Sequence, residues 1–315
     1  MKAAPAPPGE SKTAVIAAIA GNVAIAIAKF IAAAFTGSSA MLSEAIHSLV
    51  DTGNGGLILL GIHRSRLPPD AAHPFGYGHE LYFWTLVVGI FIFAIGGGMS
   101  IFEGISHVLS GQAAEASAWN YAVLGIAALF EGTSWVFGWR AFRREQRGRG
   151  VFETVHLSKD PTSFSVLFED SAALAGLAVA FLGVYLSHRL DMPALDGAAS
   201  IVIGAILSLV AIVMMRESKG LLVGEGVERP TLEAIRAILA RERCVQSVGR
   251  LLTLYLGPEE VLLTIEIQFD TRMSTLEIRD AIRRIKDAIQ SKYARITRIY
   301  FDALAMEETD DKNSV

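Results

Sequence analysis

The chain has 315 residues, 52% of them hydrophobic, and a formal net charge of −4 at pH 7. Its mean hydropathy of +0.41 is too high for an ordinary soluble protein, which predicts an integral membrane protein with some soluble mass. The small charge, without a basic arm, argues against a nucleic-acid partner, and the single cysteine, Cys244, excludes an internal disulfide framework.

A short proline-rich segment precedes a series of apolar stretches of about twenty residues, the length that a bilayer requires. We expect residues 1–12 to form a disordered cytosolic tail. The apolar stretches predict an α-helical membrane protein with six transmembrane helices, a domain that covers residues 13–222. The six spans are expected at residues 13–35, 39–62, 81–106, 118–139, 162–187 and 194–215.

Loop charges orient these spans, because Lys and Arg are retained on the cytoplasmic side of a membrane. Basic residues gather in the N-terminal tail, in the second and fourth loops and after the sixth span. Of the Lys and Arg residues, only Arg189 falls in the opposite loops. We therefore expect both chain termini on the cytoplasmic side of a lipid bilayer.

Beyond Glu225 the sequence changes to that of a small soluble α+β unit. Its predicted elements are a helix at 230–242, strands at 247–256 and 261–269, a helix that opens on a Ser274–Glu277 capping box, and a strand at 295–303. This αββαβ order predicts a ferredoxin-like or metallochaperone-like cytosolic domain over residues 226–305, with two helices on one face of its sheet. Residues 306–315 are expected to form a disordered tail.

The stretch SEAIHSLVDTGN, residues 43–54, places three ionisable side chains inside the second predicted span. Glu44, His47 and Asp51 follow one another at helical spacing, so they lie along one stripe. A carboxylate near mid-bilayer costs at least ~2.5 to 3.5 kcal/mol, so Asp51 needs a cation. An imidazole nitrogen and a carboxylate oxygen one turn apart suit a divalent transition ion such as Zn²⁺.

Two ligands do not complete a tetrahedral site, and the fifth span offers Glu169 and Asp170 as further ligands. A cation between the second and fifth spans would satisfy both helices. The alternative is an ion-pair or hydrogen-bond lattice of these residues with Lys29 and Asn22 of the first span. Glu131 of the fourth span is a candidate for an extra ligand or for proton transfer, or else a hydrogen-bond partner of a neighbouring helix.

Several separated motifs occur together along the chain. They are Asn22 and Lys29, TGSSAMLSEAIHSLVD (36–51), HPFGYGHE (73–80), Glu103-Gly104, DGAASIVIG (196–204) and the αββαβ domain. In this order they resemble the cation diffusion facilitator family of divalent-metal transporters. KDPTSFSVLFEDSAAL and RESKGLLVGE look like the branch that includes the mitochondrial zinc transporters and their bacterial relatives.

The resemblance implies a metal site made by two residues four apart in the second span and two four apart in the fifth. His47 and Asp51 match the first pair. In the fifth span, Asp170 falls at the second ligand position and Val166 at the first, where many zinc members carry histidine. Glu169 is the obvious substitute, although its neighbouring position is rotated by about 100° around the helix.

This mismatch leaves several ways to complete the site. The fifth helix is locally distorted, or the fourth ligand is water, or it comes from elsewhere. Glu131 and Glu44 are candidates for that extra ligand or for a proton path.

The resemblance also implies further metals in the second loop and the cytosolic domain of many members. Asp70 and His73 match the loop pattern, but Tyr77 replaces a histidine, which His79 only partly compensates. The last histidine of the chain is His188, so the cytosolic domain lacks the usual ligands. We interpret that domain as a dimerisation domain.

The function implied is efflux of a divalent metal cation, zinc first, in exchange for protons by alternating access. The resemblance implies a homodimer in the cell (inner) membrane, with no catalytic activity and no cofactor besides the transported cation. Mn²⁺, Fe²⁺ and Co²⁺ remain open, because one histidine with two or three carboxylates is a harder ligand set than is usual for zinc. Two distant alternatives are an intramembrane metal-dependent hydrolase and a metal sensor.

Overall fold

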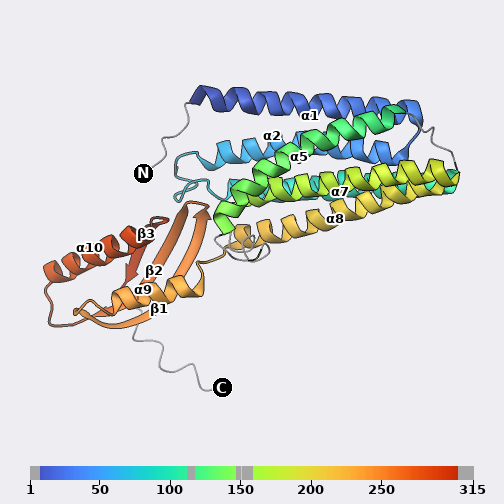
Figure 1. Cartoon of the computed structure of the whole chain (residues 1–315). Helices are drawn as coiled ribbons and strands as arrows, with labels where there is room; N and C mark the ends of the chain where they lie inside the picture. The colour runs from blue at the N-terminus through green and yellow to red at the C-terminus, as the bar shows by residue number, and fades with distance from the viewer. Residues whose placement is uncertain (1–7, 112–117, 147–149, 151–158, 304–315) are drawn as a thin grey trace, which may run out of the picture. The chain divides into compact units, whose positions relative to one another are not determined.

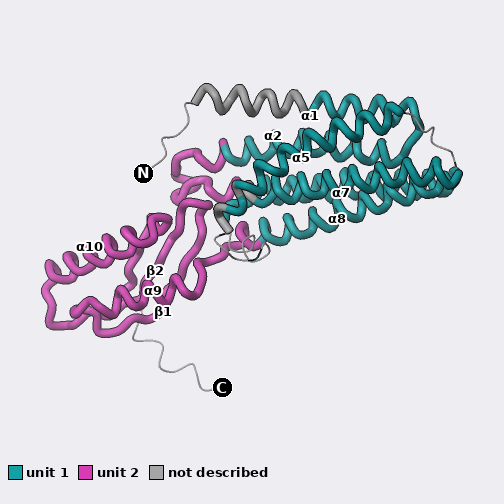
Figure 2. Tube along the Cα trace, in the orientation of Figure 1, with its two compact units in different colours: residues 1–62, 83–219 teal, residues 63–82, 220–315 magenta. Residues whose placement is uncertain are grey.

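The structure is a computed structural model, and it describes residues 8–111, 118–146, 150 and 159–303 (Figure 1). The chain divides into two compact units (Figure 2). The helical unit comprises residues 1–62 and 83–219, and the α+β unit comprises residues 63–82 and 220–315. Each unit is described by itself.

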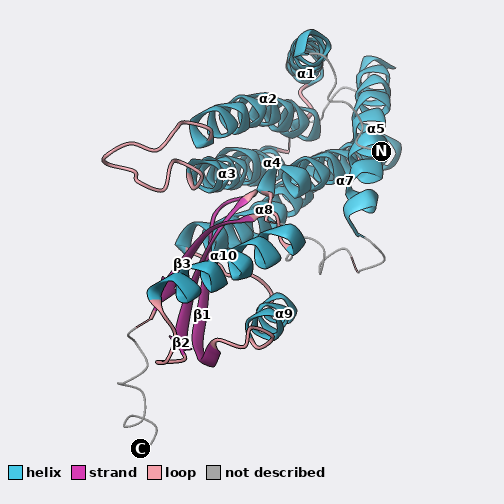
Figure 3. Cartoon of the chain, turned by 90° about the vertical axis from the view of Figure 1, so that its left-hand side faces the viewer, coloured by secondary structure: helices cyan, strands magenta, loops and turns pink. Residues whose placement is uncertain are grey.

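Helices make up most of the described chain up to Val223 (Figure 3). They are α1 (Pro8–Thr36), α2 (Ser39–Ser65), α3 (Glu80–Phe91), the π-helical segment η1 (Ile92–Met99), α4 (Ser100–Ser110), α5 (Ala118–Gln146), α7 (Pro161–Leu190) and α8 (Ala194–Val223). Helix α1 begins at Pro8, inside the segment expected to be a tail. A proline is well tolerated at the first position of a helix, where its missing N–H has no intrahelical partner to bind.

Four stretches of the described chain are long and apolar enough to cross a membrane. They are Glu80–Ser110, Ala118–Arg140, Phe164–Leu190 and Ala194–Val223, which match the last four predicted spans. The described apolar part of α1, Asn22–Thr36, is shorter than a full span. Helix α2 is long enough, but His47, Asp51 and Asn54 lower its hydropathy. The first two of the six expected spans therefore stay predictions.

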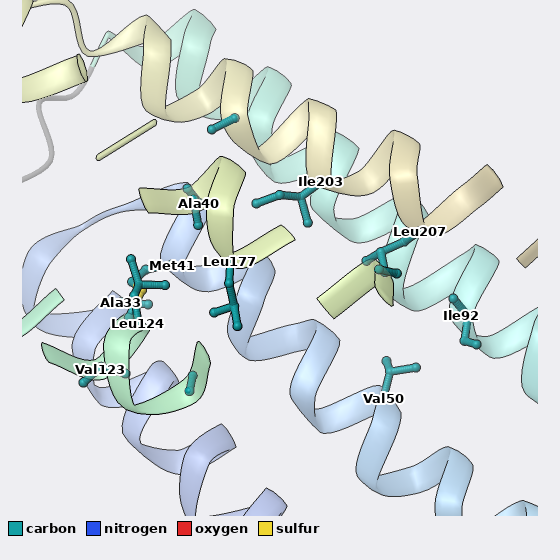
Figure 4. Packing of buried hydrophobic residues seen from close by; sticks show 14 of the residues in the cluster. Ala33, Ala40, Met41, Val50, Ile92, Val123, Leu124, Leu177, Ile203 and Leu207 are labelled. Carbon is teal, nitrogen blue, oxygen red and sulfur yellow. The ribbon is translucent and has the colours of Figure 1, made fainter. Parts of the chain in front are cut away.

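The core of the helical unit is built from small and branched apolar side chains of several helices (Figure 4). Ala33 of α1, Met41 of α2, Leu177 of α7, and Ile203 and Leu207 of α8 are each at most 7% exposed. Alanines among the larger side chains let the helices approach closely, as is typical of helix packing in membranes. This packing fixes the rotation of each helix and so decides which polar residues face inward.

The α+β unit has the predicted αββαβ order. Its elements are α9 (Arg229–Leu239), β1 (Val245–Gly257), β2 (Glu260–Phe269), α10 (Thr275–Lys292) and β3 (Ile296–Asp302). The sheet has the order β1-β2-β3, with β1 antiparallel and β3 parallel to the central β2. A parallel neighbour requires a crossover, and α10 supplies it.

Buried apolar residues alternate with more exposed ones along β2, and the buried ones form the centre of the core of this unit. Leu263, Ile265 and Ile267 are all fully buried, and they pack with Ile235 of α9 and Ile285 of α10. The predicted capping box at the start of α10 is confirmed, since the Ser274 side chain accepts from the Glu277 backbone while the Glu277 side chain accepts from the Ser274 backbone. The apolar stripe of α10 therefore faces the sheet, as its sequence pattern predicts.

Candidate metal site

A cavity of about 290 Å³ lies in the helical unit, between α1, α2, α5 and α7. Its wall is lined by Asn22, Ile25, Ser48, Asp51, Gly55, Ile58, Leu59, Glu131, Ser134, Val166, Glu169 and Asp170. Four of these residues are acidic and none is Lys or Arg. A cavity with this lining favours a cation, because carboxylates placed close together in a low dielectric repel one another.

His47 and Asp51 stand side by side on α2, at the edge of this cavity. His47 Nε2 lies 3.4 Å from Asp51 Oδ2, and the two side chains are 2% and 16% exposed. Both ring nitrogens of His47 and Oδ1 of Asp51 are buried without a hydrogen-bond partner within the described structure. Buried polar atoms are almost always satisfied, so this cluster is a candidate site for an ion or a polar ligand. The role of this pair as metal ligands stays a prediction.

The two acidic neighbours on α7 are held by different helices. Glu169 Oε1 accepts a hydrogen bond from Asn54 Nδ2 of α2 at 3.3 Å. Asp170 Oδ2 accepts one from Ser134 Oγ of α5 at 2.8 Å. Both carboxylates line the cavity, and so does Val166, one turn before Asp170. Val166, which has no donor atom, therefore faces the same cavity as the two acids.

Among the described contacts, Lys29 pairs with Glu44 and Ser48. Lys29 Nζ lies 3.0 Å from Glu44 Oε2 and 2.8 Å from Ser48 Oγ, and Lys29 and Glu44 are both fully buried. Gly176 of α7 lies against the same carboxylate, since a Cβ atom there would collide with Glu44 Oε1. Glu44 stands apart from the cavity wall, one turn from His47 along α2.

The predicted ligands are thus gathered into one region without forming a closed ligand shell. Asp51, Glu131, Glu169 and Asp170 share the cavity, and His47 adjoins Asp51. Within the described ranges, no three His, Cys, Asp or Glu side chains are close enough together to hold a metal ion as they stand. A bound ion would have to draw the α2 pair and the α7 acids toward each other.

Sequence reasoning missed the donors that position the acids. Asn54 and Ser134 each follow an acidic cavity residue by three positions, Asp51 and Glu131 respectively, so both lie on the same helix face as that acid. That spacing is the signal that would have found them. It says nothing of the partner, because the partner is on another helix.

The second loop, residues 66–79, belongs to the α+β unit. Asp70 Oδ2 accepts a hydrogen bond from Tyr77 Oη at 2.6 Å, and Asp70 Oδ1 accepts one from the His73 backbone at 2.6 Å. The Tyr77 hydroxyl, and after it the His73 N–H, hold the pKa of Asp70 below its usual range. His79 stands apart from this pair, because its Nε2 lies 2.9 Å from the carbonyl oxygen of Tyr255.

His73 Nδ1 also lies 3.4 Å from Asp70 Oδ1, so these two loop residues are close together, and a metal site in this loop stays a prediction. A Cβ atom at Gly78 would collide with the carbonyl oxygen of Leu256, so only glycine lets the loop lie this close to β1. Arg298 of β3 lies over the ring of Phe75, at 5.3 Å from its centroid. The HPFGYGHE motif docks the loop on the sheet.

Comparison with known families identifies the class of the protein. The family profile described as the cation efflux transmembrane domain matches residues 15–223. The chain belongs to this cation efflux family, whose members are cation diffusion facilitators, as the motifs predict. Its homologues are transporters, not enzymes, and the hydrolase alternative therefore receives no support.

Similar proteins come from animals, plants and bacteria. The human protein named "Proton-coupled zinc antiporter SLC30A9, mitochondrial" is 32% identical over 249 residues, which are 78% of this chain and 44% of that protein. "Metal tolerance protein C4" of Arabidopsis thaliana is 29% identical over 265 residues, 84% of this chain and 58% of that protein. "Magnetosome protein MamM" of Paramagnetospirillum magneticum is 24% identical over 301 residues, 93% of this chain and 87% of that protein. The chain spans about half the length of the zinc antiporters that it matches.

Proposed function

We propose that the protein exports a divalent metal cation, zinc first, in exchange for protons. The observation that carries the proposal is the set of unpartnered atoms on His47 and Asp51 beside a cavity lined by four acids. The printed name of the human relative, a proton-coupled zinc antiporter, supports zinc and protons as the exchanged ions. His47, Asp51 and Asp170 are the proposed ligands, with Glu169 as the fourth.

Proton exchange follows from the chemistry of these ligands. His47 binds a metal ion only in its neutral form, and the carboxylates bind it only when ionised, so protons and metal compete for the same groups. Metal release on one side of the membrane then allows protonation there, and deprotonation accompanies reloading on the other side. Glu131, which also lines the cavity, is the proposed intermediate station for those protons.

The direction of transport rests on the predicted orientation. The cavity lining continues along α2 from Ser48 to Leu59, toward the end of the helix that carries Arg64. That end is the one that the charge bias assigns to the cytoplasm. The buried contact of Lys29, Glu44 and Gly176 lies on the opposite side of the site. This arrangement fits a state that receives the ion from the cytoplasm.

We further propose that the protein works as a homodimer in the inner membrane, with the cytosolic domain as a dimerisation domain. Mn²⁺, Fe²⁺ and Co²⁺ are the competing substrates, because oxygen ligands outnumber nitrogen in the proposed site.

The test is metal uptake into sealed proteoliposomes with an acidic interior, comparing Zn²⁺, Mn²⁺, Co²⁺ and Fe²⁺. We expect accumulation of the preferred ion with matching proton efflux, and loss of both in Asp51→Ala and Asp170→Ala. Glu103→Gln, which removes an acid away from the cavity, is the matched control and should transport normally. Absence of uptake of every ion by folded wild-type protein would contradict the transporter proposal and favour a metal sensor.

A further inference from the structure

The residue that completes the proposed metal site is not settled by helical spacing, because Val166 occupies the usual ligand position. Valine has no donor atom, so a site made by the expected register has only His47, Asp51 and Asp170. Glu169 has a carboxylate, but it precedes Asp170 by one residue, about 100° around an ideal helix, instead of by the four residues of the expected pair. Glu169 lines the same cavity as Asp51 and Asp170, and a contact from outside α7 can hold its carboxylate toward them.

We propose that Asn54 is the positioning residue that makes Glu169 a metal ligand in this chain. This inference rests on the proposed transport function. Asn54 is 1% exposed and Glu169 is 9% exposed, so their hydrogen bond of 3.3 Å is shielded from water. Asn54 follows Asp51 on the same face of α2. The bond therefore ties this acid of α7 to α2, the helix that carries His47 and Asp51.

The chemistry of the amide suits this role. The Asn54 side chain donates to Oε1 and adds no charge, so Glu169 keeps its second oxygen for an ion. An aspartate in place of Asn54 would repel the carboxylate, and an apolar residue would leave it without its anchor. Partners of metal ligands act in this way generally, because they fix the orientation of the ligand before the ion arrives.

Asp170 has an anchor of its own and does not need Asn54. Ser134 of α5 donates to Asp170 at 2.8 Å, so the two neighbouring acids are fixed by different helices. The Glu169 carboxylate is thus held by α2, and the Asp170 carboxylate by α5. Removal of the Asn54 amide should therefore affect Glu169 and leave Asp170 in place.

A double-mutant cycle with Val166 separates positioning from a general structural role. Asn54→Leu keeps the size of the side chain and removes the donor. We expect it to weaken Zn²⁺ binding by about 10- to 100-fold, the usual effect of removing such a partner. In a Val166→His background the new imidazole supplies the missing ligand, so the same substitution should weaken binding by less than about 3-fold.

Zn²⁺ dissociation constants are measured by calorimetry on the purified full chain, alongside Zn²⁺ and Mn²⁺ uptake into proteoliposomes. Thr52→Val is the matched control, because the Thr52 hydroxyl bonds only to the Ser48 carbonyl oxygen of its own helix among the described contacts. Thr52→Val should leave the Zn²⁺ dissociation constant unchanged in both the wild-type and the Val166→His backgrounds. Asn54→Ser, whose shorter side chain cannot span the distance to Glu169, enters the same cycle if the leucine variant does not fold.

Equal losses from Asn54→Leu in both backgrounds would overturn the inference and assign Asn54 a structural role. Unchanged Zn²⁺ binding in Asn54→Leu would also overturn it, while Asp51-dependent transport would leave the proposed function intact. A wild-type chain that neither binds nor transports Zn²⁺ or Mn²⁺ would instead overturn the proposed function, and this inference with it.

Discussion

The helical unit and the α+β unit treat buried polar groups in opposite ways. In the described residues, every buried side-chain atom without a hydrogen-bond partner lies in the helical unit, on residues such as Glu44, His47 and Asp51. The described core of the α+β unit is mostly aliphatic, and Tyr255 and Cys244 are among its few residues with a polar atom. Unsatisfied buried groups cost free energy, and those of His47 and Asp51 lie at the proposed metal site.

Ion pairs differ between the two units in the same sense. Lys29 and Glu44 are paired at full burial in the helical unit. In the α+β unit the pairs lie at the surface, as with Arg284 and Glu242, whose side chains are 58% and 23% exposed. Water cannot replace a lost partner in the buried Lys29–Glu44 pair. It can replace one in the exposed Arg284–Glu242 pair. Equivalent substitutions should therefore have very different effects.

The largest effect is expected from Lys29→Met. This substitution leaves the Glu44 carboxylate buried without a cation, which typically costs about 3–5 kcal/mol of stability. The free energy of unfolding is measured by titration with a denaturing detergent. Lys29→Met combined with Glu44→Met should recover most of the loss, because an apolar pair of similar volume is often neutral. A single variant as stable as wild type would contradict the contrast between the units.

Arg284→Met is the counterpart in the α+β unit. Its guanidinium donates to Glu242 at 3.0 Å, but solvent screens the pair and hydrates Glu242 when the arginine is absent. We expect no measurable change in the free energy of unfolding of this unit. That free energy is measured in the full chain by hydrogen exchange of the β2 amides. Ile285→Ala serves as the positive control for that measurement, since it opens a hole in the core. If Arg284→Met lowered the stability of this unit as much as Ile285→Ala, the contrast between buried and surface ion pairs would be contradicted.

Local features of the fold could be predicted from the sequence because their causes lie within a few residues. The capping box of α10 needs only Ser274 and Glu277, and the buried face of β2 needs only alternation. The length and apolarity of the later membrane helices are also local properties. Helix α1 begins at Pro8, before the span expected from residue 13, because a proline suits the first turn of a helix as well as it suits a tail.

Contacts between helices could not be predicted in the same way, because they depend on how each helix is rotated in the bundle. Glu169 and Asp170 were identified from their unfavourable location in a bilayer. Their different anchors, Asn54 and Ser134, became apparent only in the folded chain. The same applies to Lys29. The sequence suggested it as a lattice partner of the candidate ligands, and in the fold it pairs with Glu44.

The smallest effect is expected at the docked loop, from Tyr77→Phe. The Tyr77 hydroxyl is the largest cause of the lowered pKa of Asp70, so its removal should raise that pKa toward the usual value of about 3.9. Carboxyl NMR of the ¹³C-labelled chain measures the change directly. His73→Ala, which retains the backbone donor, is the matched control and should leave most of the shift in place.

The sign of the pH dependence follows from both partners of this hydrogen bond. The folded-state pKa of Asp70 is lowered, so its stabilisation is complete above about 3.9 and is lost as pH falls through the lower folded value. The same bond raises the pKa of Tyr77, so its stabilisation is complete below about 10 and is lost as pH rises through the raised value. The loop should therefore resist proteolysis equally across the range between these values in wild type. A proteolysis rate that changes steeply near neutral pH would mean that a histidine, not the Asp70–Tyr77 bond, controls the loop.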